Sequence, residues 1–160
     1  MFKIGDYITH PMHGAGVIES IVTKKINGSQ RDYYVLKLPV GDMVVMVPVS
    51  GCEDIGVRSI ISRSEAEKLF SAFSEIEIST TQNWNKRYRE NMDKIKSGNL
   101  LDVASVVKGL MCRDSERGLS TSERKMLHSA KQILISELVI ATDMDYDGVE
   151  KRLCAALKEG

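Results

Sequence analysis

Residues 59–73 read SIISRSEAEKLFSAF, and within this stretch the repeat of apolar residues changes. Before it, apolar and polar residues alternate, as they do in half-buried strands. After it, apolar residues recur at the helical spacing of about 3.6 residues. Ser64 followed by Glu67 matches the capping box that opens a helix, so the spacing predicts a short helix ending near residue 73. The pattern therefore divides the chain at about residue 62.

The first part, residues 1–62, is rich in Val, Ile and Tyr. Its alternating runs are YITH, GVIESIVTKKI, RDYYVLKLPV and MVVMVPV. Asn27-Gly28 supplies the positive φ angles of a two-residue hairpin, and Gly41-Asp42 predicts a second tight turn. A few short strands joined by tight turns favour a small β-barrel of the SH3 or Tudor-like type.

The second part is predicted to be helical, which makes the chain an α+β protein. Residues 63–79 are expected to form the short helix and a linker, and residues 80–160 an all-α helical bundle. Asn83 can cap a helix that ends at Gly98, and a second helix is expected from residue 100 to about 112. A second capping box, Ser120 with Glu123, predicts a helix to about residue 142, and a last helix follows from about residue 148.

The composition is that of a soluble folded protein, with 42% hydrophobic and 28% charged residues among 160. No apolar run approaches the roughly 20 residues of a membrane span, and the N-terminus is too polar for a secretory signal, so the cytoplasm is expected. The net charge of zero hides a division. Residues 79–142 carry a charge of +4, between two segments of −2 each. A basic middle segment suggests one surface that binds phosphates.

Several short patterns resemble ligand sites without completing one. DMDYDG at 143–148 matches the first half of a calcium loop, but its twelfth position, which requires Glu, is Cys154. His10 and His13 are spaced like half a metal site with no second pair to complete it. The three cysteines are too far apart for a zinc pattern. No nucleophile with a base and no phosphate-binding glycine loop is present. The sequence predicts no enzyme, metal, cofactor or small-molecule substrate.

Trp84 is the only tryptophan, and it stands among lysines and arginines at the start of a predicted helix. One interpretation places it at the head of the apolar stripe formed with Tyr88, Met92 and Ile95, packed in the core. The other points it outward, where the surrounding cations grip a nucleic-acid backbone while a flat apolar ring presses on the bases. Residue types alone leave both open.

Four segments carry a resemblance to a known family. They are FKIGDYITHPMHGAGVIESI, YYVLKLPVGDMVVMVPV, NWNKRYRENMDKIKSG and RDSERGLSTSERKMLHSAKQILISEL. Together they resemble, over nearly the whole chain, the CarD family of bacterial transcription regulators in its CdnL-type branch. The resemblance implies a Tudor-like N-terminal domain that binds the RNA polymerase β subunit. It also implies a helical C-terminal domain that contacts promoter DNA at the upstream edge of the transcription bubble.

In that family a tryptophan wedges into the minor groove and stabilises the open complex, and Trp84 occupies its place. The residues expected on the DNA side are Trp84, Lys86, Arg87, Arg89, Arg117, Arg124 and Lys125. The residues expected on the polymerase side are Lys24, Lys25, Met46, Val47 and Pro48. Met46 departs from the family, because some relatives have arginine there.

The resemblance implies a regulator associated with the nucleoid through polymerase. Two other classes remain open at this stage. A stand-alone architectural DNA-binding protein would bind duplex DNA without polymerase, although a charge of +4 argues against strong independent binding. A structural interaction module with no role at DNA would keep Trp84 in its core.

Overall fold

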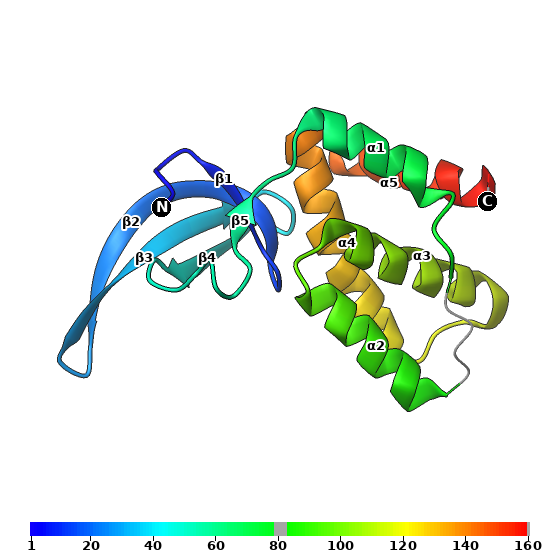
Figure 1. The fold of residues 1–160 in the computed structure, drawn as a ribbon, viewed down its shortest axis with the longest axis horizontal. Helices are drawn as coiled ribbons and strands as arrows, with labels where there is room; N and C mark the ends of the chain where they lie inside the picture. The colour runs from blue at the N-terminus through cyan, green and yellow to red at the C-terminus, as the bar shows by residue number, and fades with distance from the viewer. Residues whose placement is uncertain (79–82, 160) are drawn as a thin grey trace.

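The computed structural model describes residues 1–78 and 83–159, and it confirms the α+β class (Figure 1). An antiparallel sheet comes first and a set of helices follows. Residue 79, the last of the expected linker, and residues 80–82, the first of the expected bundle, lie outside the described residues. The strands are β1 (Tyr7–His10), β2 (Gly14–Ile26), β3 (Ser29–Leu38), β4 (Met43–Pro48) and β5 (Arg58–Ser59).

The sheet is open, so the expected closed barrel needs correcting. Its strand order is β4-β3-β2-β1-β5, and the two outer strands do not pair with each other. Closing a sheet into a barrel requires a ladder between its first and last strands. Here β5 has only two residues, both of them paired with β1. The outer edge of β4 is left without a partner strand among the described residues.

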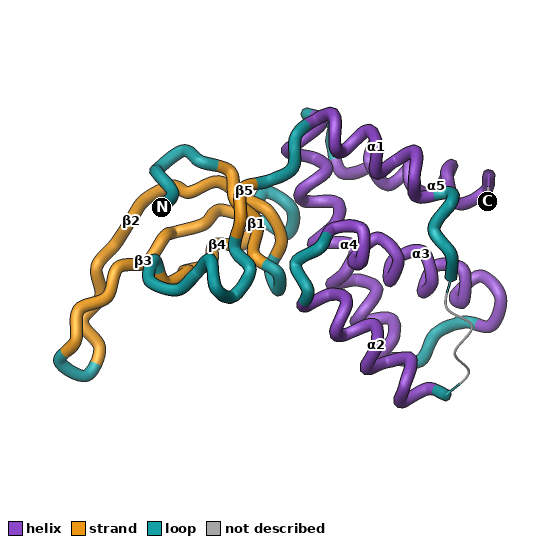
Figure 2. Tube along the Cα trace, viewed as in Figure 1, coloured by secondary structure: helices purple, strands orange, loops and turns teal. Residues whose placement is uncertain are grey.

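The hairpin between β2 and β3 confirms the turn predicted at Asn27-Gly28, whose φ angles are 51° and 82°. β4 covers β3 only along residues 33–38, so the outer ends of β2 and β3 pair only with each other. This ribbon, residues 23–32, projects from the sheet in Figures 1 and 2. All of its side chains are exposed.

The helices follow the predicted order with two changes. They are α1 (Arg63–Phe73), α2 (Trp84–Lys96), α3 (Leu100–Arg117), α4 (Thr121–Thr142) and α5 (Tyr146–Glu159). Helix α1 is capped by Ser62 with Glu65, two residues before the predicted box. Helix α3 runs five residues past its predicted end at 112, to Arg117. The N-caps predicted at Asn83 and Ser120 are confirmed.

Helix α4 is the centre of the molecule, packing against α1, α3 and α5 and also against β2 (Figure 1). One apolar core lies inside the sheet, around Ile8, Tyr34 and Leu36, and a larger one lies among the helices. Polar contacts join the two at the seam between them. Glu137 of α4 is fully buried there and binds the guanidinium of Arg58, with oxygen–nitrogen distances of 2.7 and 3.0 Å. This seam sets the position of the helices relative to the sheet.

Candidate functional site

Trp84 opens helix α2 and lies at the surface. The Asn83 side chain caps the helix by accepting a hydrogen bond of 3.0 Å from the backbone N–H of Lys86. Trp84 is 41% exposed, and its ring stacks on that of Tyr88, with ring centroids 5.1 Å apart and planes inclined by 20°. Trp84 does not belong to the core of the bundle. The interpretation that places it in the core is therefore wrong.

The rest of the apolar stripe runs from this exposed ring into the bundle. Tyr88 and Met92 are half-buried against the core, and Ile95 is buried. Helix α2 thus has its last turns packed and its first turn at the edge of the bundle. At that edge the Trp84 ring stacks on Tyr88 and keeps 41% of its surface exposed.

Arg87, one turn beyond Trp84, is not available for a phosphate, which corrects the sequence prediction. It is only 7% exposed, and its Nε donates to Oε2 of Glu123 at 3.2 Å. Glu123 is 3% exposed, and its other oxygen lies 4.0 Å from Nε of Arg113. Buried charges of this kind are paired because desolvation would otherwise be too costly. Arg87 ties α2 to the first turn of α4.

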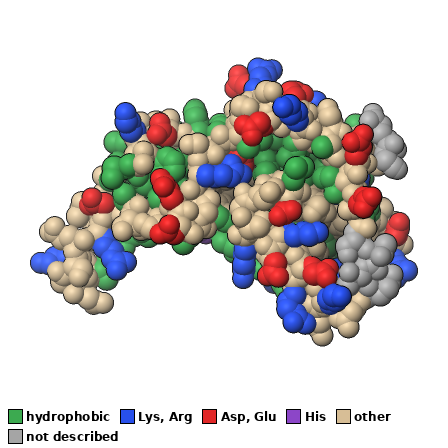
Figure 3. All heavy atoms as spheres, viewed as in Figure 1, with side chains coloured by type: hydrophobic (Ala, Val, Ile, Leu, Met, Phe, Trp, Pro, Cys, Tyr) green, Lys and Arg blue, Asp and Glu red, His purple; other side chains and the backbone are tan. Residues whose placement is uncertain are grey.

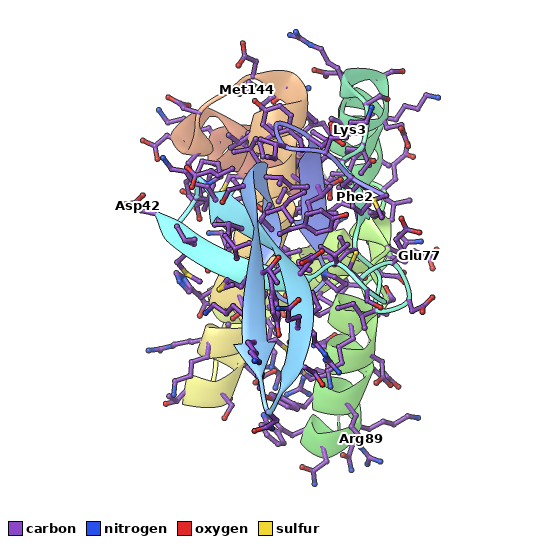
Figure 4. All side chains as sticks on the ribbon, turned by 90° about the vertical axis from the view of Figure 1, so that its left-hand side faces the viewer. Phe2, Lys3, Asp42, Glu77, Arg89 and Met144 are labelled. Carbon is purple, nitrogen blue, oxygen red and sulfur yellow. The ribbon has the colours of Figure 1, made fainter. Side chains whose placement is uncertain are left out.

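The other basic residues predicted for the DNA side are exposed. Lys86 and Arg89 lie on α2, Arg117 ends α3, and Arg124 and Lys125 begin α4. None of these five forms an ion pair with another described residue. In Figure 4 Arg89, the sixth residue of α2, points away from the molecule. Figure 3 shows Lys and Arg side chains along this end of the bundle, interspersed with Asp and Glu. The set forms a mixed but cation-bearing surface beside Trp84.

The sheet carries a second exposed surface, on the face turned away from its core. Cross-strand rows place Val22, Tyr33 and Pro48 side by side, and Ser20, Val35 and Met46 next to them. All six are partly exposed, and Val44 on β4 is 61% exposed. Side chains two residues apart share a face of a strand, so Lys24 and Arg31 continue this face onto the ribbon. We call these residues the outer face of the sheet.

Not all residues predicted for the polymerase side lie on the outer face. Met46 and Pro48 do, with Lys24. Val47 points the other way and is buried in the sheet core, so its predicted direct contact is corrected. Lys25 is exposed but follows Lys24 directly and therefore points to the opposite side of the ribbon.

The ligand-like patterns have structural roles. Asp145 caps α5, accepting a hydrogen bond of 2.7 Å from the backbone N–H of Gly148. Nδ1 of His10 accepts from the N–H of Met12 at 3.0 Å, and burial and the neighbouring His13 lower the pKa of His10. Burial raises the pKa of the Cys52 and Cys112 thiols. Within residues 1–78 and 83–159 no group of acidic, His and Cys side chains could hold a metal ion, and no helix is both long and apolar enough to cross a bilayer.

The sequence did not predict the buried side-chain contacts that support these two surfaces. Glu123 was recognisable as the third residue of a helix but not as the partner of Arg87, which is 36 positions away. The core interpretation already packed Trp84 against Tyr88, and the two rings do stack, but Trp84 stays at the surface instead of entering the core. Glu137 had no signal beyond being a charged residue in an apolar helix, which is itself a reason to expect a buried partner.

An open sheet with an exposed apolar face is joined to a helical bundle with an exposed tryptophan and cations, which gives the molecule two candidate binding surfaces. Comparison with known proteins identifies the family of the chain. The family model "CarD-like/TRCF RID domain" matches residues 2–61, and the model "CarD, C-terminal domain" matches residues 68–154. The chain belongs to the CarD family.

A similar protein is "Putative transcription factor YdeB" of Bacillus subtilis (strain 168). It is 39% identical over 140 residues, which cover 88% of this chain and 92% of that protein. The family and this relative make the chain a non-enzymatic transcription regulator related to RNA polymerase interaction.

Proposed function

We propose that the protein binds the β subunit of RNA polymerase through its sheet and promoter DNA through its helical bundle. Trp84 wedges into the minor groove at the upstream edge of the transcription bubble and stabilises the open complex. The observation that carries this proposal is the exposed Trp84 ring on the first turn of α2, with the exposed cations Lys86 and Arg89 on the same helix. The protein would act where polymerase binds promoter DNA, which is in the cytoplasm at the nucleoid.

The outer face of the sheet supports the polymerase part of the proposal. Its centre is apolar, as interface centres are, and Lys24 and Arg31 add two cations at one end. These two residues are paired directly across the ribbon, where like charges repel. Both are exposed, so an acidic patch on a partner would relieve that repulsion. The unpaired edge of β4 also offers backbone groups to an added strand.

The surface around Trp84 supports the DNA part. Lys86, Arg89, Arg117, Arg124 and Lys125 are exposed and can neutralise phosphates, while the tryptophan ring supplies flat apolar area for a base. Arg87 is left out of this set because Glu123 holds it inside the bundle. Phosphate contacts carry no sequence information, so this surface would not select a promoter by its sequence. It would bind DNA at a position that polymerase has already selected.

The mechanism is energetic rather than chemical. Stacking of an aromatic ring on a base contributes about 1–3 kcal/mol, which corresponds to roughly 5- to 150-fold in an equilibrium constant. Opening a base step costs a few kcal/mol, and polymerase itself already meets that cost in the melted complex. Contacts that are stronger in the open complex than in the closed complex shift the equilibrium toward the open complex. The size of the shift is the difference in binding free energy between the two complexes. Binding of the sheet to polymerase raises the local concentration of the bundle at the promoter.

The test uses the full-length protein and two variants on the same polymerase and promoter. Trp84→Ala should shorten the open-complex half-life on the order of tenfold relative to the unchanged protein, because a stacking contact is lost. Polymerase affinity and thermal stability should hardly change, since Trp84 lies outside the core. Val44→Asp, on the exposed β4 edge, should instead weaken polymerase binding. A normal half-life with correctly folded Trp84→Ala defeats the wedge.

A stand-alone architectural role is the second candidate, favoured by the same exposed ring and cations. It predicts that the protein binds duplex DNA tightly without polymerase. We expect weak binding there, because the cations near Trp84 are interspersed with carboxylates (Figure 3). A measurement of duplex affinity at 50 and 150 mM salt separates the two candidates. Tight binding in the absence of polymerase would favour the architectural role.

A further inference from the structure

A cluster of three charged side chains, two of them buried, includes a residue of the first turn of α2, the turn that carries Trp84. It consists of Arg87 from α2, Glu123 from α4 and Arg113 from the last part of α3. Glu123 also faces the Ser120 hydroxyl at 3.4 Å, within its own N-terminal cap. One carboxylate therefore joins three helices at the end of the bundle where the exposed tryptophan lies.

The N-terminus of helix α2 is electrostatically unfavourable, and this cluster offsets the unfavourable charge. A helix N-terminus carries a partial positive charge and is stabilised by acidic residues in its first turn. The first turn of α2 has no acidic residue, and Lys86, Arg87 and Arg89 follow within it or just after. Such a terminus tends to fray, because its first N–H groups also lack helical partners. A cation-rich first turn is nevertheless what a phosphate-binding surface requires.

Glu123 supplies the missing negative charge from another helix. Its Oε2 accepts from Nε of Arg87 at 3.2 Å, and both side chains are almost fully buried. Arg87 comes three residues after Trp84, so the two share the first turn of α2. A rigid anchor at Arg87 therefore restricts the motion of the Trp84 backbone, and stacking on Tyr88 restricts the ring itself.

We propose that Arg87 and Glu123 are positioning residues, which hold the first turn of α2 so that Trp84 is presented in a fixed orientation. The inference rests on the proposed function for its biological consequence, but not for its structural content. It assigns Arg87 a role opposite to that of its exposed neighbours. Arg87 makes no phosphate contact, and an acidic residue close to the DNA-facing surface improves the engagement of DNA.

The two roles make opposite predictions for Glu123→Gln. If cations near Trp84 act only by attracting phosphates, removal of a nearby carboxylate should lengthen the open-complex half-life. If Glu123 positions Trp84, the same variant should shorten it, by about 3- to 10-fold, because a ring that must be ordered on binding loses affinity. Arg87→Gln should have the same effect as Glu123→Gln.

The salt dependence of the half-life supplies the matched control. Log half-life falls as log salt rises, and a lost phosphate contact reduces the steepness of this fall, here called the slope, by about 0.9. Arg89→Gln removes an exposed cation and should lower the slope by about that amount. Arg87→Gln removes the same charge from a buried site and should leave the slope unchanged. An equal fall in slope for both variants would overturn the inference, because Arg87 would then contact a phosphate.

The orientation of Trp84 can be read directly in the free protein, since it is the only tryptophan. Both Glu123→Gln and Arg87→Gln should lower the steady-state anisotropy of its emission and raise its quenching by acrylamide, at temperatures where the far-ultraviolet circular dichroism is unchanged. Unchanged Trp84 fluorescence in both variants contradicts a positioning role. If either variant unfolds, Glu123→Asp and Arg87→Lys keep the charges and should give the same changes to a smaller extent.

Failure of this inference is distinguishable from failure of the proposed function. Trp84→Ala, measured in parallel, tests the function alone. If Trp84→Ala leaves the half-life unchanged, the wedge is wrong, and the fluorescence of the Arg87 and Glu123 variants still decides whether these residues fix the ring. If Trp84→Ala shortens the half-life while Glu123→Gln lengthens it, the wedge stands and the positioning role falls.

Discussion

Arg124 is the exposed cation on which a direct phosphate contact is easiest to test. It lies in the first turns of α4, where a negative charge suits the helix dipole, so Arg124→Glu should change the free energy of unfolding by less than about 0.5 kcal/mol. The slope of log open-complex half-life against log salt should fall by about 0.9 or more, since at least one phosphate contact is lost. Thermal melts and half-lives at several salt concentrations measure both quantities.

The control for Arg124→Glu is Lys151→Glu, which makes the same change of net charge on the exposed side of α5. It should leave the salt slope unchanged. Equal slopes for the two variants would mean that Arg124 acts through net charge alone and makes no contact of its own.

Arg87 and Arg89 show what residue type alone cannot predict. Both are arginines two positions apart on one helix, and the sequence assigned both to the DNA surface. The helix turns by about 200° between them, so they face different directions. Which one is buried depends on Glu123, whose position in space follows from the packing of α4. The exposure of Trp84 was undecided for the same reason, because a stripe shows which side of a helix is apolar but not how far the bundle extends along it.

At the scale of elements, most helix and strand positions could be predicted from the sequence, but the start of α1 could not. Two Ser-x-x-Glu patterns overlap there, Ser62 with Glu65 and Ser64 with Glu67, and both fit a capping box. The first forms the cap. Glu67 instead pairs with Arg152 of α5 at 2.9 Å, a tertiary contact that the two equal local signals could not predict.

The cap of α1 makes a pH-dependent contribution to stability. The Glu65 carboxylate accepts hydrogen bonds from the Ser62 backbone N–H at 3.2 Å and from its hydroxyl at 3.1 Å, and these bonds lower the pKa of Glu65 below its ordinary value of 4.5. A lowered pKa in the folded state means that the carboxylate stabilises the fold above about pH 4.5, and that this contribution is lost as the pH falls through the folded pKa.

Glu65→Gln should therefore lower the melting temperature at pH 7 and have progressively less effect below about pH 4.5. The amide still accepts a hydrogen bond but carries no charge at the helix N-terminus. Thermal melts from pH 3 to 7 measure the difference from the unchanged protein. Glu75→Gln removes a charge just beyond the other end of α1 and should not lower the melting temperature at pH 7. A Glu65→Gln difference that is constant with pH would contradict the role of the charge.

The sheet shows a similar limit on what the sequence can predict. The turn at Asn27-Gly28 and the alternating runs predicted the hairpins, because turn chemistry is local. Closure into a barrel depends on the length of the last strand, and β5 has only two residues. The result is an open sheet in which β4 has no partner strand on its outer side among the described residues.

At the scale of the whole molecule, the seam between sheet and helices was absent from the sequence analysis. Besides binding Arg58, Glu137 accepts a hydrogen bond of 2.8 Å from the Ile61 backbone N–H, and Arg58 also donates to the Gly98 carbonyl at 3.3 Å. The Ser136 hydroxyl accepts a bond of 2.9 Å from the backbone N–H of Ala15. These contacts join residues up to 121 positions apart, which no local pattern encodes. In the proposed function, this seam means that the position of the sheet on polymerase determines the position of the bundle.

Gly14 provides the test of this seam, with Gly28 as its control. Both have positive φ, 97° and 82°, so an alanine costs each about 1–2 kcal/mol in backbone strain. At Gly28 an added Cβ meets nothing within 4 Å, but at Gly14 it would lie 2.5 Å from the Ser136 hydroxyl and 3.3 Å from the Ile133 Cα. Gly14→Ala should therefore cost about 1–3 kcal/mol more than Gly28→Ala. It should also increase the radius of gyration in small-angle scattering and shorten the open-complex half-life, with polymerase affinity retained. Equal effects of the two variants would show that the seam does not hold the helices in place.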